Sequence, residues 1–131
     1  MVFVLTVRFQ CIMVNNLLVI NILAYNYGSS AAPNAGSASG TYALQAATFA
    51  YSQAQAAGIN AKVGLSPMIG QSTITTEFFK QADASQVLTW AKSQPWVQLI
   101  SFVSANRDNV GLSGITQKAN EFASIFVQYE N

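Results

Sequence analysis

The 131-residue sequence contains no histidine and only one cysteine, Cys11. Without histidine, a Ser-His-Asp triad, a Cys/His zinc site and any other site that depends on an imidazole are excluded. A single cysteine excludes an intramolecular disulfide, and its position inside an apolar run is typical of a small buried side chain. We therefore expect neither a metal nor an organic cofactor.

Charged residues are also scarce, at 8% of the chain against about 25% in an ordinary globular protein. Six Lys and Arg, scattered from Arg8 to Lys118, and five Asp and Glu give a net charge of +1. No basic stripe is available to hold a phosphate backbone, so nucleic acid is not an expected partner. The length suits one domain, but a complete (β/α)8 barrel, which takes about 250 residues, does not fit.

The most apolar part of the sequence is its first 25 residues. A signal peptide carries its positive charge ahead of the apolar core, whereas Arg8 lies inside this stretch. A membrane span would bury Arg8 near its centre at a cost of roughly 2.5–3.5 kcal/mol. β-Branched and aromatic residues favour two strands, over about 2–14 and 17–23, with an Asn-Asn pair between them. A targeting segment, a membrane anchor and a helix remain the alternatives.

Beyond this stretch, strand-like and helix-like segments alternate. The expected order is a loop over 28–40, a helix over 41–57, a strand over 59–66, a loop to 81, a helix over 85–93, a strand over 96–103, a loop over 104–113 and a helix over 115–129. Asp83 or a neighbouring residue is the expected cap of the second helix, and Ser113 that of the last. Such alternation is typical of right-handed βαβ units in a parallel sheet, with the loops after the strands on one functional edge.

Three of these segments resemble family 18 glycoside hydrolases, the chitinase-like enzymes. The sequence VINILAYNYG at 19–28 is similar to the family's sixth strand, VGLSPMIG at 63–70 to its seventh, and LISFVSANRD at 99–108 to its eighth. The resemblance implies an α/β fold that is part of a TIM (β/α)8 barrel, with about three βα units and parallel strands. This part covers 18–131, and the apolar segment 1–17 shows no such resemblance.

Family 18 enzymes hydrolyse β-1,4-linked polymers of N-acetylglucosamine, with one carboxylic acid and the substrate's own acetamido group. The acid belongs to a fourth-strand motif, Asp-x-x-Asp-x-Asp-x-Glu, and nothing of that form occurs in this sequence. The resemblance therefore implies a truncated chitinase-like hydrolase that is inactive alone, with chitin as its partner and a secreted or cell-surface location. The alternative is a non-catalytic module that binds chitin or another carbohydrate.

The chain has five carboxylates, and no two of them alternate along a strand as the last Asp and Glu of the motif must. Structural roles suit them better. We expect Glu77 in a loop, Asp83 as a cap, Glu121 and Glu130 on a solvated helix face, and Asp108 paired with Arg107 or another loop residue. No catalytic residue is therefore predicted.

The resemblance also assigns binding roles at the sixth strand. Tyr25 and Asn26 match a Tyr and an Asp that hold the acetamido group in the family. Asn26 still forms hydrogen bonds but lacks the negative charge that stabilises a developing oxazolinium ion. An aromatic residue of the barrel core is the alternative role for Tyr25.

The remaining predicted binding residues are Tyr27, Met68 and Asn106. Met68 matches a seventh-strand Met that shapes the pocket, although core packing is its alternative role. Val103 matches the eighth-strand Trp whose ring forms the floor of the sugar subsite, so a stacking surface is lost. Any surviving affinity for sugar is therefore expected to be weak.

Strands taken from a barrel leave two sheet edges whose backbone groups are unpaired. We expect the first strand and the segment 97–102 at these edges, and an uncovered inner face where the rest of a barrel would lie. Self-association through the open edges is the predicted consequence.

Overall fold

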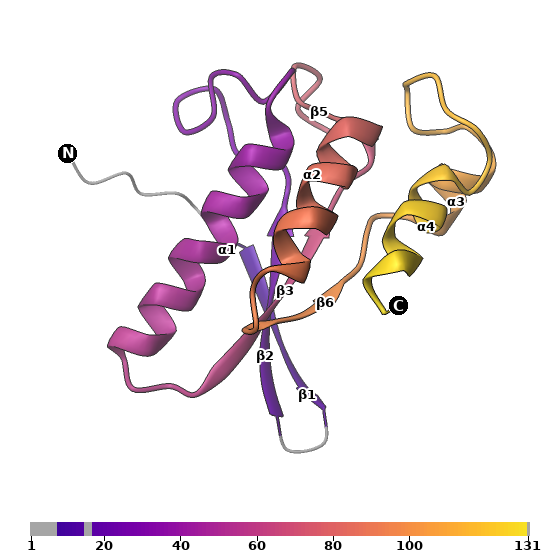
Figure 1. Cartoon of the computed structure of the whole chain (residues 1–131). Helices are drawn as coiled ribbons and strands as arrows, with labels where there is room; N and C mark the ends of the chain where they lie inside the picture. Colours follow the sequence, from indigo (N-terminus) through magenta and orange to yellow (C-terminus); the bar gives the residue numbers. More distant parts are fainter. Residues whose placement is uncertain (1–7, 15–16, 131) are drawn as a thin grey trace.

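The computed structural model of the protein describes residues 8–14 and 17–130. Its elements in chain order are β1 (Arg8–Val14), β2 (Leu17–Ala24), α1 (Ser39–Ala56), β3 (Ala61–Pro67), β4 (Gly70–Gln71), β5 (Phe78–Phe79), α2 (Gln81–Lys92), β6 (Val97–Ile100), α3 (Ala105–Asn109), α4 (Glu121–Phe126) and the 3-10 helix η1 (Val127–Tyr129) (Figure 1). The two strands expected near the N-terminus, over about 2–14 and 17–23, are thus present over the described residues, while 2–7 lie outside them. The Asn-Asn pair predicted between them lies outside the described residues.

The main sheet has the strand order β1-β2-β3-β6, and β2, β3 and β6 are parallel to one another. The prediction of parallel strands is confirmed for these three, while β1, in the segment before them, pairs antiparallel to β2, with Val14 opposite Leu17. The reason is the length of the connection, because a parallel pair needs a crossover of about a dozen residues or more. The result is a mixed α/β fold with three parallel strands, consistent with part of a barrel. The match to strands six to eight stays a prediction.

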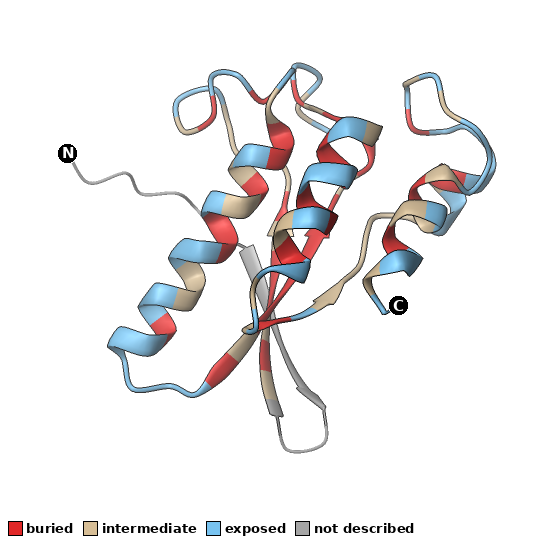
Figure 2. Cartoon of the chain, viewed as in Figure 1, coloured by how far each residue is buried: buried red, intermediate tan, exposed pale blue. Residues whose placement is uncertain are grey.

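The helices cover one face of this sheet (Figure 1), and the buried positions of α1 and α2 lie on the sides of these helices that are turned toward the strands (Figure 2). Alanine provides most of the buried surface of α1, which combines high helix propensity with a short side chain. The core between the layers consists mainly of apolar residues from β2, α1, β3, α2 and α4, among them Ile22, Val63, Leu65, Val87 and Phe122. This packing fixes the ends of the parallel strands in relation to the loops that follow them.

The opposite face of β3 is buried as well. Val63 and Leu65 point to the helices, so the intervening Gly64 faces the other way. A Cβ atom on Gly64 would lie 2.7 Å from Cγ of Leu99 and 2.8 Å from Oδ1 of Asn21, which come from the two neighbouring strands. The expected uncovered inner face is therefore wrong at β3. Because Gly64 has no side chain, its neighbours close over it.

Asp83 caps its helix as predicted, from the third helical position, whereas the predicted cap Ser113 is wrong. Helix α2 begins at Gln81, so Asp83 lies in its first turn, where its carboxylate accepts hydrogen bonds from N of Lys80 (2.7 Å) and N of Gly40 (2.8 Å). The final helix begins at Glu121 and not near Ser113, because Asn120 adopts a left-handed conformation (φ 58°) that a helix cannot include. Local sequence thus misplaces both helix starts.

Asp108 caps this final helix from a distance. Its Oδ1 accepts from N of Phe122 (3.0 Å), and its Oδ2 accepts from N of Ala123 (2.8 Å). Of the two partners expected for Asp108, Arg107 is wrong, because its guanidinium donates to the carbonyl groups of Ile69 and Gln71. The alternative, another loop residue, is confirmed, since Nε2 of Gln117 donates to Oδ1 of Asp108 (2.8 Å). A buried carboxylate at a helix N-terminus satisfies backbone donors that have no partner within the helix.

We expect Asp108→Asn to lower the free energy of unfolding by about 1–3 kcal/mol, because the amide would place a donor against an N–H that needs an acceptor. Urea denaturation at neutral pH measures this loss. Glu130→Gln is the matched control, since Glu130 is exposed, and its effect should stay within about 0.5 kcal/mol. Equal losses in both variants would show that charge, and not the cap, is responsible.

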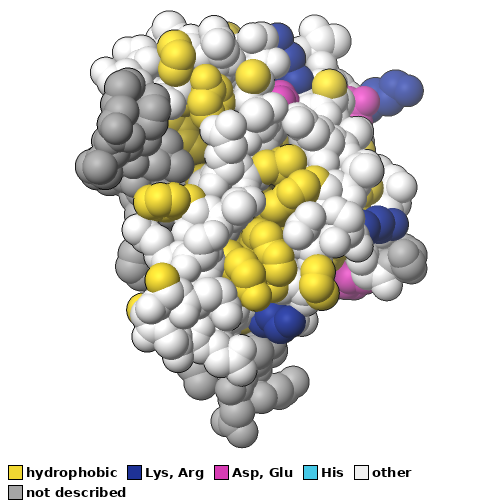
Figure 3. Space-filling model, turned by 60° about the vertical axis from the view of Figure 1, so that its left-hand side comes forward, with side chains coloured by type: hydrophobic (Ala, Val, Ile, Leu, Met, Phe, Trp, Pro, Cys, Tyr) yellow, Lys and Arg dark blue, Asp and Glu magenta, His cyan; other side chains and the backbone are white. Residues whose placement is uncertain are grey.

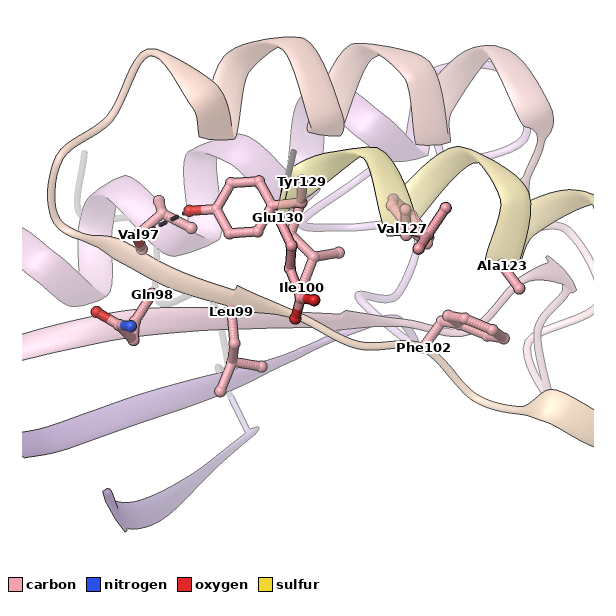
Figure 4. Close-up of a pocket in the computed structure, with 10 residues that line it drawn as sticks. Val97, Gln98, Leu99, Ile100, Phe102, Ala123, Val127, Tyr129 and Glu130 are labelled. Carbon is pink, nitrogen blue, oxygen red and sulfur yellow. Dashed lines mark hydrogen bonds between the residues drawn. The ribbon is translucent and has the colours of Figure 1, made fainter. Parts of the chain in front are cut away.

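Strand β6 forms the second edge of the described sheet, and a groove of about 690 Å³ lies beside it. Figure 4 shows Leu99, Ile100 and Phe102 along its strand side and residues of α4 and η1 along the other. The Tyr129 side chain spans the end of the groove, and its hydroxyl donates to O of Val97 (2.8 Å). The edge predicted for 97–102 is therefore present over Val97–Ile100.

Candidate functional site

Three of the five predicted binding residues meet at the carboxyl ends of β2 and β3. Tyr25, Tyr27 and Met68 line one small cavity, together with Ala24, Ser39, Ser72, Glu77, Phe78 and Phe79. The cavity volume is about 10 Å³, which is close to the least that holds one water molecule. The chain thus gathers these residues at the expected edge but leaves no space for a sugar.

The other predicted residues lie outside this cavity. Asn106 is exposed in α3, and its carbonyl accepts from N of Val110 within the helix end. Val103 forms a parallel bridge with Met68, so the position expected to lie under the sugar is next to the Met expected to shape the pocket. Their relative placement agrees with neighbouring barrel strands, while Asn106 is not brought to the cavity.

Asn26 is held by the loop that follows β4. Its backbone is left-handed (φ 56°), a conformation that Asn tolerates better than most residues. Its Nδ2 donates to Oγ1 of Thr73 (2.6 Å), while its Oδ1 accepts from Oγ of Ser72 (2.7 Å) and N of Ile74 (3.4 Å). Much of the hydrogen-bonding capacity of this amide is therefore used within the protein.

Glu77 fixes the other end of the same loop. Only 3% of its surface is exposed, and its carboxylate accepts from N of Tyr27 (3.2 Å) and N of Gly28 (2.8 Å). The loop also closes on itself, since N of Ser72 donates to O of Glu77 (3.0 Å). We call residues 72–77 the 72–77 loop. It is attached to the segment after β2 at two places.

The hydroxyl of Tyr27 is buried and has no hydrogen-bond partner in the described part of the chain. Its ring lies 5.8 Å from that of Tyr42, between ring centres. Burial is the main cause that raises the pKa of Tyr27, and the negative charges of Glu77 and Asp83 raise it further. A neutral phenol with an unsatisfied polar atom therefore lies at the centre of the candidate site.

This buried phenol predicts a loss of stability at alkaline pH. In the unfolded chain a Tyr ionises near pH 10, whereas folded Tyr27 keeps its proton above that pH. The unfolded state then binds fewer protons, so stability should fall as the pH rises above about 10, by up to about 1.4 kcal/mol per pH unit. Tyr27→Phe should reduce this slope and cost no stability at pH 7, because the lost hydroxyl has no partner.

Urea denaturation at pH 7 and pH 10.5 tests this expectation. Tyr51→Phe is the matched control, because the Tyr51 ring is also held in an aromatic contact, stacked 4.3 Å from the Trp96 ring. An alkaline slope that is the same in wild-type protein and Tyr27→Phe would contradict the prediction.

The partners of Asn26 and Tyr27 were not among the residues predicted from the sequence. Ser72, Thr73 and Glu77 lie 46–50 positions from the residues they bind, and nothing in the local sequence distinguishes them from ordinary loop residues. Between residues 8 and 130, excluding 15–16, no group of three or more Cys, Asp and Glu is placed to hold a metal ion. Within the same residues, no helix has both the length and the apolar character to cross a membrane.

The sequence matches no protein-family model and no curated protein. Its structure is similar to a solved structure described as catalytic site mutants of active domain 2 of chitinase from Pyrococcus furiosus, with a TM-score of 0.69 and 21% sequence identity. The similarity covers 84% of this chain but only 39% of that one. The chain therefore has the fold of part of a chitinase domain.

Proposed function

We propose that this chain is a truncated chitinase-like domain that binds polymers of β-1,4-linked N-acetylglucosamine weakly and does not cleave them on its own. The observation that carries the proposal is the meeting of Tyr25, Tyr27 and Met68 at one cavity. The cavity lies at the carboxyl ends of parallel strands, where barrel enzymes have their active sites. The likeness of the fold to a chitinase domain supports this choice of ligand. A secreted or cell-surface location is part of the same proposal.

The carboxylates support the absence of catalysis. Glu77, Asp83 and Asp108 are buried, and each accepts hydrogen bonds from backbone N–H groups. A general acid must hold a proton and present it to the leaving oxygen, whereas these groups are placed as acceptors for fixed donors. Glu121 is partly exposed, and hydrogen bonds from Gln81 and from N of Lys118 lower its pKa, which also opposes a role as proton donor.

The coverage of 39% of the chitinase domain favours a second function. The chain would then be one part of an enzyme, active only when the missing strands are supplied as a separate polypeptide. Both functions predict the same binding edge. Only the second predicts that hydrolysis appears when a polypeptide carrying the fourth-strand acid motif is added.

Titration of the N-acetylglucosamine trimer against the chain, followed by NMR, tests the binding. We expect weak binding, because Val103 offers no ring for stacking, and we expect Tyr25→Phe to reduce the affinity about fivefold through the loss of one hydrogen bond. Tyr51→Phe, far along α1 from the cavity, should bind as the wild type does. Equal affinity of Tyr25→Phe and wild type would remove Tyr25 from the site.

A further inference from the structure

We propose that the 72–77 loop is a lid that closes a sugar pocket in this structure, and that the Asn26 side chain is its latch. The inference rests on the proposed function, since it concerns access to the same site. It assigns Asn26 a role different from direct binding of the acetamido group. Asn26 would act by holding the loop over Tyr25, Tyr27 and Met68.

The size of the cavity is the first observation. Its volume of about 10 Å³ is far below the roughly 300 Å³ or more of ordinary ligand pockets. Of its lining residues, Ser72, Glu77 and Phe78 come from the loop or from its junction with β5. Because the remaining walls belong to strand ends and a helix start, outward movement of the loop is the change that enlarges the cavity without disrupting the sheet.

The distribution of contacts along the loop is the second observation. Its ends, Ser72 and Glu77, are buried, whereas Thr73, Thr75 and Thr76 between them are exposed. The tip is therefore held by hydrogen bonds more than by apolar packing, and most of those from outside the loop come from Asn26. Each such bond changes the equilibrium between the closed and the open state by only about two- to tenfold, so the loss of one bond should populate the open state measurably.

The unpaired Tyr27 hydroxyl is the third observation. In the closed state it lies in the protein without a partner, which is unfavourable for a polar atom. Opening of the lid would expose it to water or to a hydroxyl or acetamido group of a sugar. A ligand that satisfies this atom binds the open state and not the closed one, which is the differential affinity that shifts such an equilibrium.

Amide hydrogen exchange tests the latch without any ligand. Asn26→Gly removes all three side-chain bonds and suits the left-handed backbone, while Thr73→Ala removes one bond and leaves Asn26 in place. We expect faster exchange at the Ile74 amide, about two- to fivefold in Thr73→Ala and more in Asn26→Gly. Thr75→Ala, an exposed Thr→Ala change in the same loop, is the matched control. Unchanged exchange in both latch variants would overturn the proposal.

Titration of the N-acetylglucosamine trimer then tests the lid. Thr73→Ala should bind about two- to fivefold more tightly than wild type, because a smaller part of the population is closed, and Thr75→Ala should bind as wild type does. Equal or weaker binding by Thr73→Ala would overturn the lid. If exchange rises as expected but no variant binds the trimer, the latch stands while the lid over a sugar pocket and the proposed function both fail.

Discussion

Incubated with oligomers of N-acetylglucosamine, the purified chain should release no reducing ends above background. The sequence lacks the Asp-x-x-Asp-x-Asp-x-Glu motif, and the buried carboxylates are occupied by backbone donors. General acid catalysis alone contributes about a hundredfold to ten-thousandfold, so the deficit relative to an intact chitinase should be at least that large.

A reducing-end assay run beside an active chitinase measures this deficit. A preparation of Asp108→Asn, purified in the same way, controls for contaminating enzyme, because a contaminant would give equal rates in both preparations. Hydrolysis by the wild type that disappears in a variant of one of its own carboxylates would contradict the prediction.

Light scattering after size exclusion should show a second copy of the chain bound at the β6 edge, giving species larger than the 14.0 kDa monomer. Val97–Ile100 contains no Lys or Pro to discourage strand pairing, and the groove beside it has Glu130 as its one charged residue. Charged residues make up only 8% of the whole chain, and Figure 3 shows apolar side chains gathered on another side of the molecule, the one at the left of Figure 1. Little electrostatic repulsion therefore opposes association.

Gln98→Lys should shift the population toward monomer by about tenfold or more in the association constant, because it places a charge on the exposed edge. Gln98 is exposed and lines the groove. Gln53→Lys, at an exposed position of α1, adds the same charge away from β6 and should leave association unchanged. A single monodisperse species near 14.0 kDa in the wild type would show that the edge does not recruit a second copy.

The parallel strands were predictable from two different patterns. The sequence over 17–23 is a continuous apolar run, typical of a strand buried on both faces, whereas 59–66 alternates apolar and polar residues. The start of the last helix was harder to predict. The left-handed Asn120 delays the last helix, and its conformation depends on the backbone bond that N of Asn120 donates to O of Asp108 (3.0 Å). The apolar periodicity over 115–129 predicts a helix, but it gives no information about that tertiary contact or about where the helix begins.

The sequence predicts where the candidate site lies, but it does not predict that a loop closes the site. The resemblance placed Tyr25, Tyr27 and Met68 at one edge, because residues just after parallel strands must meet there. That the 72–77 loop occupies the space above them depends on contacts between segments nearly fifty residues apart. Ser, Thr and Asn side chains can form hydrogen bonds with many partners. Which partner each one binds depends on which segments meet in the folded chain, and the local sequence does not show this.

Asp83 joins the first turns of two helices that are separated in the chain by three strands, β3, β4 and β5. One carboxylate oxygen accepts from Gly40 at the start of α1, and the other accepts from Lys80 at the start of α2. The helices approach so closely that a Cβ on Gly40 would lie 3.0 Å from Cα of Asp83. The hydrogen bond to Gly40 is lost when either helix start opens, whereas the bond to Lys80 lies within the start of α2. We therefore expect the amide of Gly40 to lose its protection from exchange whenever the first turn of α2 unfolds.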